Sequence, residues 1–441
     1  MLSDLICATA TASGRAAVAL VRLSGRGAVT AAHRVLHWPP DREPQPRRAY
    51  LTSFHEADGT PFDRGLVTFY PGPGSYTGED LVEFACHGGL LASSQLVAAL
   101  MAAGARLALP GEFTRRAVAH GKMDLIQAEA IGDLVDASTR AQGRAAIRQL
   151  HGGLSRRLGE LRSALIDLLA LLAYDIDFPE QDDGPIDRAA LEEAIGRPAA
   201  AIEGLLETAS LGERVRRGAL VVIAGRPNAG KSSLFNALLG TERALVTEIA
   251  GTTRDTIEAD LDLDGYAVRL ADTAGLRFSE DRIERLGIEV SRRYLGAADL
   301  ILLCIEGGAD PTDEEQTLAA EPKTLTVRTK VDLYAAPAPA VSALTGTGLG
   351  ELKRLLVDRL YGDVEALGDT APLLTRERHR QGLGVALAAL RDATVEVKQG
   401  GDSVLAAHHV RRAVTALDEL LGRVDVEEVL GRIFERFCVG K

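Results

Sequence analysis

The sequence has few features of a secreted, membrane or zinc-binding protein. Only four cysteines occur among its 441 residues, and no two of them form a C-x-x-C pair. Such spacing indicates neither a zinc site nor a disulfide framework, and it fits a reducing cytosol. No basic segment followed by an apolar run opens the chain, and the longest apolar stretch, residues 165–174, is short and contains Asp167. We therefore expect a cytoplasmic protein without a signal peptide or a membrane span.

Aromatic residues are also scarce, and the net charge is negative. Aromatic side chains make up 4% of the chain, so aliphatic side chains must fill most of its cores. The formal net charge of −12 argues against a generally basic nucleic-acid-binding protein and leaves any RNA contact to local patches. The remaining composition, with 46% hydrophobic and 25% charged residues, is typical of a globular protein. The length favours about three domains.

The most informative stretch is residues 225–232, which read GRPNAGKS. An apolar run precedes them and a helical pattern follows, which is the strand, loop and helix order of a phosphate-binding loop. In such a loop the backbone N–H groups hold phosphates, Lys231 reaches the β- and γ-phosphates, and the Ser232 hydroxyl can bind Mg²⁺. An ordinary glycine-rich turn is the alternative. It is disfavoured because partner motifs follow in order.

Two of these motifs indicate contacts with phosphate and Mg²⁺. They are residues 251–255, GTTRD, and residues 272–275, DTAG. Thr253 can present its hydroxyl to Mg²⁺, Asp272 can hold the ion through water, and the Gly275 N–H can reach the γ-phosphate. The order and spacing are those of a GTPase.

A third motif, residues 329–332 with sequence TKVD, indicates recognition of guanine, together with the SAL sequence at 342–344. Asp332 can accept hydrogen bonds from guanine N1–H and the 2-amino group, which adenine lacks, so we expect GTP rather than ATP. Thr329 stands where this motif more often has asparagine. Its contact with the phosphate loop is therefore less certain.

The catalytic group is not obvious, because Leu276 follows the DTAG motif and cannot orient an attacking water. Glu280, Asp281 and Glu284 follow, and each is able to activate water through a hydrogen bond, although a solvated acidic turn is the simpler interpretation. No arginine finger is identifiable, although Arg254 and Arg277 are near. A monovalent cation held by the Asn228 side chain and by switch-loop carbonyls is an alternative source of positive charge.

Outside this region the pattern indicates an α+β segment and then helices. Residues 71–80 are rich in glycine and are either a binding loop or a long turn, with the turn favoured. Leucines at 154, 158, 161, 165, 168 and 172 step by four and three residues and predict a packing seam, in a helical bundle rather than a coiled coil. Arginines at 140, 144, 148, 156, 157 and 162 indicate either an RNA-facing surface or a solvated helix face.

Several stretches together resemble the MnmE (TrmE) family of tRNA-modification GTPases, within the TrmE-Era-EngA-like GTPases. The resemblance covers essentially the whole chain and is highly specific in combination. The stretches are 111–117 (GEFTRRA), 121–125 (GKMDL), 127–130 (QAEA), the phosphate loop, 251–255, and 437–441 (FCVGK).

The resemblance implies a potassium-activated GTPase whose G domains pair during hydrolysis and which forms a homodimer through a folate-binding N-terminal domain. It also implies a complex, a heterotetramer or larger, with a flavin-dependent partner, MnmG, which alone holds FAD. Together such proteins add a carboxymethylaminomethyl or aminomethyl group to C5 of the wobble uridine of certain tRNAs. The one-carbon donor is a tetrahydrofolate derivative, 5-formyl or 5,10-methylene.

The predicted fold is a multidomain α/β protein with a doubly wound Ras-like G domain inserted into an α-helical bundle domain. The predicted domains are an α+β folate-binding and dimerisation domain (1–118), the first part of the helical domain (119–215), the G domain (216–364) and the second part of the helical domain (365–441).

The resemblance also assigns residues. Glu284, twelve positions after Asp272, becomes the carboxylate that activates water, and Cys438 becomes a possible functional thiol. Mg²⁺ is assigned to Ser232 and Thr253, K⁺ to Asn228, Thr247, Ile249 and Thr252, and folate to Arg22, Glu83, Lys122 and Lys441. GTP is assigned to Asn228, Ala229, Gly230, Lys231, Ser232, Ser233, Thr247, Glu248, Ile249, Ala250, Gly251, Thr252, Thr253, Asp272, Thr273, Ala274, Gly275, Thr329, Lys330, Asp332, Ser342 and Ala343.

Two other functions compete with this one. A regulatory GTPase that docks on structured RNA would normally carry a basic RNA-binding domain, whereas the C-terminal segment is helical and of mixed charge. A one-carbon transferase regulated by GTP would need a second active site, for which the sequence provides no independent sign.

Overall fold

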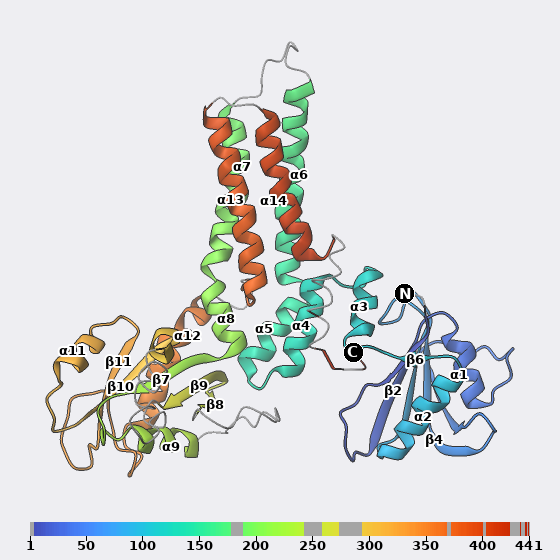
Figure 1. Ribbon diagram of the computed structural model, residues 1–441, viewed down its shortest axis with the longest axis horizontal. Coiled ribbons are helices and arrows are strands. Elements are labelled where there is room, and N and C mark those ends of the chain that lie inside the picture. Colours follow the sequence, from blue (N-terminus) through green and yellow to red (C-terminus); the bar gives the residue numbers. More distant parts are fainter. Residues whose placement is uncertain are drawn as a thin grey trace, which may run out of the picture. The chain divides into compact units, whose positions relative to one another are not determined.

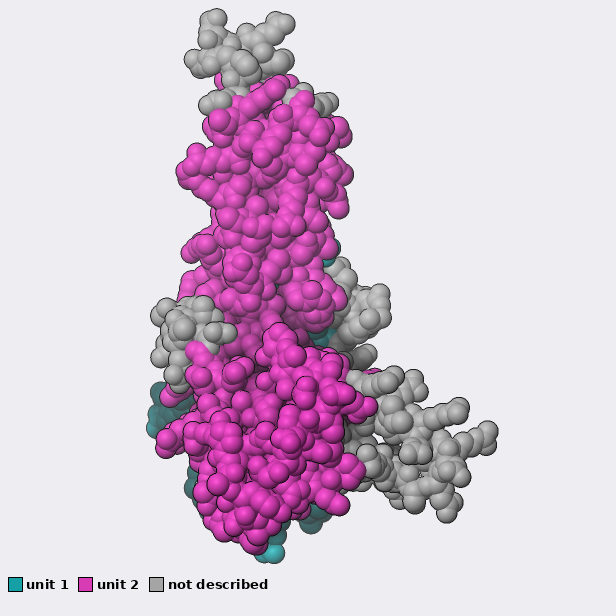
Figure 2. Space-filling view, turned by 90° about the vertical axis from the view of Figure 1, so that its left-hand side faces the viewer, with its two compact units in different colours: residues 1–132, 418–441 teal, residues 133–417 magenta. Residues whose placement is uncertain are grey.

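The computed structural model describes residues 4–177, 188–241, 258–272, 293–367, 372–399, 403–423, 433, 437, 438 and 440. Two compact units make up the chain, one of residues 1–132 and 418–441 and the other of residues 133–417 (Figure 2). The four predicted domains are a finer division, and their boundaries stay a prediction.

The first unit is built on a six-stranded sheet with the order β3-β4-β5-β2-β1-β6. Neighbouring strands are antiparallel except β1 and β6, which are parallel. Helices α1 and α2 pack on one face, where alternate strand residues such as Val21, Phe69 and Phe84 are buried. The elements are β1 (Ile6–Thr9), β2 (Val18–Ser24), α1 (Ala28–Leu36), β3 (Ala49–His55), β4 (Pro61–Tyr70), β5 (Leu81–His87), α2 (Leu90–Ala102), β6 (Arg106–Leu107) and α3 (Glu112–Ala119). Helix α4 (Leu125–Asp136) begins in this unit and ends in the second.

The second unit contains a six-stranded sheet with the order β12-β11-β10-β7-β9-β8. Only β8 runs antiparallel, paired with β9 through the turn at Asp264 and Gly265, which confirms the predicted hairpin. The parallel strands β7, β10 and β11 are almost entirely buried or half-buried, as expected for strands covered by helices on both faces. The elements are β7 (Ala219–Ala224), α9 (Lys231–Thr241), β8 (Glu258–Leu263), β9 (Tyr266–Asp272), β10 (Leu300–Glu306), α11 (Asp313–Ala319), β11 (Thr324–Thr329), β12 (Ala340–Val341) and α12 (Leu349–Leu367).

Long helices complete the second unit. Helices α6, α7, α13 and α14 run alongside one another (Figure 1), and the predicted leucine seam on α6 is buried along its whole length. These features confirm a bundle rather than a coiled coil. Most of the predicted arginine row, including Arg140, Arg144, Arg156 and Arg157, is exposed. The elements are α5 (Arg140–Leu150), α6 (Gly153–Asp177), α7 (Arg188–Glu207), α8 (Ala209–Arg217), α13 (Glu377–Gln399) and α14 (Ser403–Leu421).

The predicted fold class is therefore confirmed, because an α+β sheet domain, a helical bundle and a doubly wound G domain are all present. Within the described ranges, no helix offers an apolar stretch of the length that a bilayer requires.

Candidate functional site

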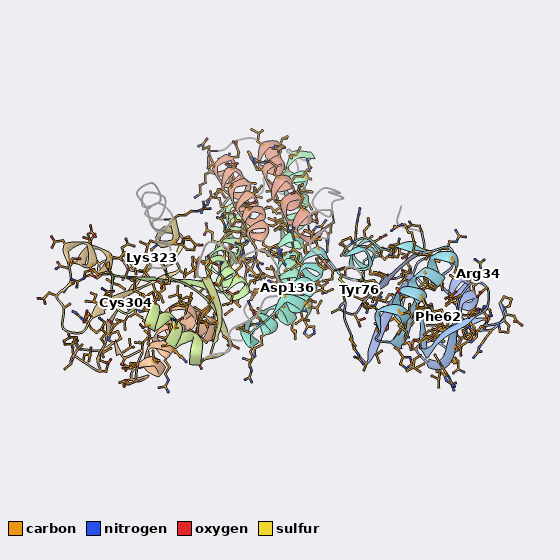
Figure 3. All side chains as sticks on the ribbon, turned by 60° about the horizontal axis from the view of Figure 1, so that its bottom comes forward. Arg34, Phe62, Tyr76, Asp136, Cys304 and Lys323 are labelled. Atoms are coloured by element: carbon orange, nitrogen blue, oxygen red, sulfur yellow. The ribbon has the colours of Figure 1, made fainter. Side chains whose placement is uncertain are left out.

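The phosphate-binding loop joins the end of β7 to the start of α9. Gly225 has a φ of +135°, and a Cβ atom there would lie 2.3 Å from the carbonyl oxygen of Cys304 on β10. Only glycine fits so close to a neighbouring strand. Asn228 and Gly230 also have positive φ, of 63° and 84°. The loop conformation thus depends on the residues at these positions. Cys304, labelled in Figure 3, is fully buried on β10, and burial raises the pKa of its thiol to about 12.

The Lys231 side chain folds back onto the phosphate-binding loop. Its side chain is buried, and Nζ donates hydrogen bonds to the carbonyl oxygens of Gly225 at 2.8 Å and Arg226 at 2.6 Å. These bonds place a positive charge beside the backbone N–H groups at the start of α9, where P-loop proteins bind phosphate.

Two predicted Mg²⁺-associated residues meet at the end of β9. The Ser232 hydroxyl donates a hydrogen bond to Asp272 Oδ2 at 2.8 Å, and Asp272 is buried. A hydroxyl and a carboxylate are the hard oxygen donors that Mg²⁺ prefers. The donor set therefore fits this ion.

The predicted guanine-reading residues lie after β11 and β12. The Ser342 hydroxyl is fully buried and donates a hydrogen bond to Asp332 Oδ1 at 2.6 Å, while the Asp332 residue is exposed. This bond orients a carboxylate that is open to a ligand. Lys330, two residues before Asp332 in the motif, has a φ of 57° and pairs with Glu306 at 3.2 Å.

Thr329 contacts the phosphate loop although it replaces the usual asparagine. Its hydroxyl donates to the Ala229 carbonyl oxygen at 2.7 Å, and the side chain is buried. The carbonyl oxygen of Ile305 lies at 3.4 Å. A threonine hydroxyl therefore ties the guanine motif to the loop, a point that the sequence left uncertain.

We expect Thr329→Val to lower the affinity for GDP by about two- to tenfold. Valine has nearly the same shape but leaves the Ala229 carbonyl without this donor, which costs about 0.5–1.5 kcal/mol. Calorimetric titration with GDP measures the change. Thr326→Val, on the same strand but with a half-exposed side chain, is the matched control. Equal affinities of the two variants would contradict the role of the hydroxyl.

One loop contact was missed by the sequence analysis. Arg226 Nε donates to Glu315 Oε1 at 3.1 Å, and another of its nitrogens donates to the Asp310 carbonyl at 2.9 Å. Glu315 also closes the capping box of α11 with Thr312. The capping box is readable in the sequence as T-x-x-E, but its link to Arg226 depends on the fold.

The first unit brings together two of the predicted folate residues. Arg22 and Glu83 are register partners on β2 and β5, and Arg22 Nε donates to Glu83 Oε1 at 2.9 Å. Arg22 also donates to the carbonyl oxygen of Gly440 at 3.3 Å, and its guanidinium lies 5.5 Å from the centre of the Tyr76 ring. The C-terminal segment thus reaches the same face of the sheet.

Lys122 lies against the glycine-rich loop of residues 71–80, where its Nζ donates to the Pro73 carbonyl oxygen at 2.8 Å. This loop contains no helix or strand, but Ser24 hydrogen-bonds Thr77 at 2.7 Å and the His120 ring hydrogen-bonds the Thr77 carbonyl at 2.7 Å. The segment is a defined loop. Whether it binds a ligand stays a prediction.

A buried ion network secures this loop. Arg116 is fully buried, and it donates to Glu79 Oε2 at 3.0 Å, Asp4 Oδ1 at 2.7 Å and Glu112 Oε1 at 2.9 Å. Arg106 adds two hydrogen bonds to Glu112. Burial opposes ionisation of Glu112, but the bonds from Arg106, the Leu109 N–H and Arg116 outweigh it and lower its pKa.

The remaining predicted residues divide into two groups. Ser233, Ala229 and Ala343 lie in or beside the nucleotide loops, and Cys438 is exposed, with its carbonyl oxygen accepting a hydrogen bond from Gly111 N–H at 3.4 Å. The following predicted residues lie outside the described residues: Thr247, Glu248, Ile249, Ala250, Gly251, Thr252, Thr253, Thr273, Ala274, Gly275, Glu284 and Lys441.

Two protein-family models match almost the entire chain. The model of the MnmE helical domain matches residues 125–438, and the model of the GTP-binding protein TrmE N-terminus matches residues 5–122.

Relatives match along the full length. A tRNA modification GTPase MnmE from Phenylobacterium zucineum is 44% identical over 457 residues and covers 100% of both chains. That of Methylobacterium radiotolerans is 44% identical over 454 residues, covering 100% of this chain and 99% of its own. A solved structure, the G domain of the T. maritima FeoB iron transporter, is 31% identical, covers 32% of this chain and 98% of its own, and has a TM-score of 0.25. Because that TM-score is too low to carry an argument, the relationship rests on the full-length relatives.

Proposed function

The chain belongs to the MnmE family of tRNA modification GTPases and is a GTP hydrolase in tRNA modification, and we propose that it is potassium-activated and acts on the wobble uridine. With a flavin-dependent partner, MnmG, it installs a carboxymethylaminomethyl or aminomethyl group at C5 of that uridine in certain tRNAs. A tetrahydrofolate derivative is the one-carbon donor. Hydrolysis is coupled to the pairing of two G domains in a homodimer.

The proposed nucleotide site rests on two hydrogen bonds between side chains, Ser232 with Asp272 and Ser342 with Asp332. The first pair supplies oxygen ligands for Mg²⁺ beside the phosphate loop. The second presents an oriented carboxylate to the N1–H and 2-amino donors of guanine. The hydrogen bond from Thr329 to the Ala229 carbonyl oxygen joins the guanine motif to the phosphate loop, which supports one GTP–Mg²⁺ site.

Asn228 in the phosphate loop supports the proposal of potassium activation. Asn228 is exposed, so its side-chain oxygen is accessible to a cation, and backbone carbonyls of Thr247, Ile249 and Thr252 would complete the coordination. A cation there places positive charge near the phosphates, where other GTPases use an arginine. This assignment suits a chain in which Leu276 cannot orient water.

Folate binding is supported by the chemistry of the first unit. Glu83 offers a carboxylate that can pair with the donor edge of a pterin, and Arg22 and Lys122 offer cations for an anionic end. Arg22 already contacts the C-terminal segment through Gly440. Lys441 lies outside the described residues, and its assignment to the folate rests on the resemblance.

The hydrolysis assignment has a direct test. We expect GTP turnover to fall by about 100-fold or more when Na⁺ replaces K⁺ or when Glu284 is changed to Ala, since each removes transition-state stabilisation of the size found for single catalytic groups. Phosphate release at saturating GTP measures it, with GDP affinity as the control for binding. Turnover that persists in both cases would refute the catalytic assignment while leaving nucleotide binding intact.

The modification itself is tested by mass analysis of tRNA nucleosides from a strain that lacks this chain. We expect the C5 substituent of the wobble uridine to disappear and to return with the wild-type gene but not with a Lys231→Ala variant. Unchanged wobble uridines would refute the proposal and favour a regulatory GTPase that docks on RNA.

A further inference from the structure

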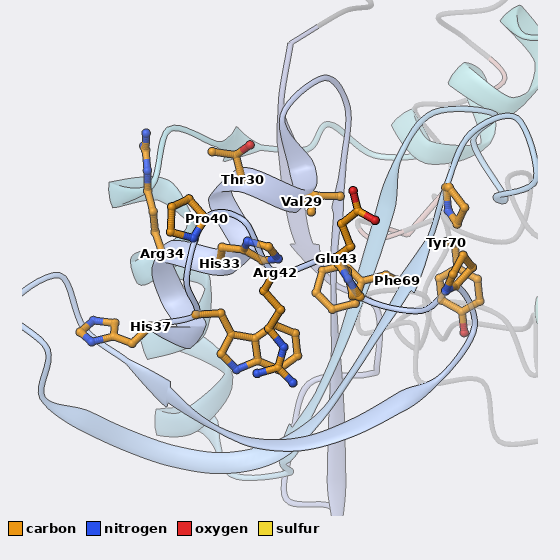
Figure 4. Close-up of a pocket in the computed structure, with 14 residues that line it drawn as sticks. Val29, Thr30, His33, Arg34, His37, Pro40, Arg42, Glu43, Phe69 and Tyr70 are labelled. Carbon is orange, nitrogen blue, oxygen red and sulfur yellow. The ribbon is translucent and has the colours of Figure 1, made fainter.

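The first unit contains a cavity of about 760 Å³ that none of the predicted site residues lines. It lies between α1, the segment after it, and the end of β4 (Figure 4). Val29 and His33 of α1, Trp38 and Arg42 of the following segment, and Phe69 of β4 form much of its wall. Its volume falls in the range of about 300–1,000 Å³ that is typical of small-molecule sites.

Most of this cavity lies on the face of the sheet opposite the Arg22–Glu83 pair. Glu83 lies directly opposite Thr68 in the pairing of β4 with β5, so the next residue, Phe69, points to the other face of the sheet. Phe69 is buried there against the helical layer. Tyr70, which also lines the cavity, lies on the Glu83 face, and burial together with Glu83 raises its pKa. The Phe69 side of the cavity is therefore opposite Glu83, and the Tyr70 side borders it.

His33 provides an unusual polar group in the cavity wall. Its side chain is only 6% exposed, and Nε2 is buried without a hydrogen-bond partner among the described residues. Burial and the nearby Arg42 lower its pKa, so the ring is neutral at pH 7. A buried nitrogen of this kind costs free energy unless a ligand or water satisfies it.

Arg42 provides a cation with unused donors. Its guanidinium carbon lies 3.5 Å from the centre of the Trp38 ring, and the described residues offer it no hydrogen-bond acceptor. Trp38 itself lies at 5.8 Å from Phe69 in a stacked arrangement. The wall thus joins an aromatic surface to a guanidinium, beside the buried His33 nitrogen (Figure 4).

We propose that this cavity binds a planar aromatic anion, a ring that bears a carboxylate or a phosphate. The ring packs against Trp38 and Phe69, and the anionic group pairs with Arg42. Of the other charged residues in the wall, Arg34 donates to the Ala103 carbonyl, and Glu43 disfavours a second anionic group. The inference is independent of the proposed function.

Calorimetric titration of the full-length chain tests this site. The probes are naphthalene-2-carboxylate and phenyl phosphate, which carry the two kinds of anionic group. Naphthalene-2-methanol, acetate and inorganic phosphate are the comparators that lack either the charge or the ring. We expect one molecule of probe per chain, at an affinity at least about tenfold above every comparator. Quenching of Trp38, the only tryptophan in the chain, reports the same binding.

Single substitutions test where in the first unit the probe binds. We expect Arg42→Gln to weaken binding by about tenfold or more, because a charge-assisted hydrogen bond is lost. Arg48→Gln, which removes the same charge from the same segment but does not line the cavity, is expected to leave binding unchanged. His33→Phe keeps an aromatic ring and removes the polar atom. Its affinity for the probes should change little, because neither probe has a polar atom besides its anionic group, and where this variant fails to fold the Arg42 comparison decides.

Three results would overturn the proposal. They are equal binding of the neutral ring, equal losses in Arg42→Gln and Arg48→Gln, and a loss caused by Arg22→Gln but not by Arg42→Gln. The last would place the probe at the opposite face of the sheet. Binding of only one probe supports the site and identifies its anionic group.

Discussion

Replacing Asp332 with Asn is expected to lower the affinity for GTP by about 100-fold to 10,000-fold and to create measurable affinity for xanthosine triphosphate. The carboxylate of Asp332 accepts hydrogen bonds from two donors on guanine, and each bond to a charged group is worth about 1.5–3 kcal/mol. Asparagine can accept from one donor only, and its NH₂ group meets the 2-amino group unfavourably. Xanthine has an oxygen at that position, which the NH₂ group can satisfy.

Competition between GTP, xanthosine triphosphate and ATP for a labelled guanine nucleotide measures this switch. Ser342→Ala is the matched control, because it removes the hydroxyl that donates to Asp332 Oδ1 without changing the carboxylate. We expect it to weaken GTP binding by about tenfold or less and to give no affinity for xanthosine triphosphate. GTP affinity retained by Asp332→Asn would show that another residue reads the base.

Replacing Arg116 with Met is expected to destabilise the first unit by about 3–5 kcal/mol, the usual result of removing one partner from a buried ion network. Arg116 is fully buried, and without it Glu79 loses its charged partner and Glu112 keeps only Arg106. Denaturant unfolding followed by fluorescence reports this unit selectively, since the only tryptophan is Trp38.

Arg157→Met is the control, because Arg157 pairs with Glu160 at the surface and is 44% exposed. Such a pair contributes about 0–1 kcal/mol, so little change is expected. Midpoints that shift equally in the two variants would mean that the Arg116 network is not structural.

Acid should weaken the same network. The pKa of Asp4 is lowered chiefly by its hydrogen bond from Arg106, and that of Glu112 by its bonds from Arg106, the Leu109 N–H and Arg116 against the effect of burial. Groups with lowered folded pKa values stabilise the protein above their unfolded values, 3.8 and 4.5, and that contribution is lost as the pH falls through the folded values. Unfolding midpoints between pH 5 and pH 3 should therefore fall more steeply for the wild type than for Arg116→Met.

Much of the fold could be predicted because local pattern and packing agree. The hairpin of β8 and β9 was readable from alternation around Asp264 and Gly265, and the α6 leucine seam from its helical spacing. Both signals arise because one face of each element is buried, so that apolar residues recur at the spacing of a strand or of a helix. The six-stranded order of the first sheet was not readable, because its pairings join residues such as Arg22 and Glu83 that are far apart in the chain.

By itself the sequence determined the chemistry of the nucleotide site. A phosphate loop needs glycines, a lysine and a hydroxyl within a few consecutive residues, and a guanine reader needs one carboxylate after a strand, so both leave a contiguous record. Tertiary structure alone decided which distant groups meet: the Thr329 hydroxyl with Ala229, Arg226 with Glu315, Arg116 with three carboxylates, and His33 with an aromatic wall and Arg42. Hydrogen bonds and cavities form between side chains that strand register and helix packing bring together, and no local spacing encodes those partners.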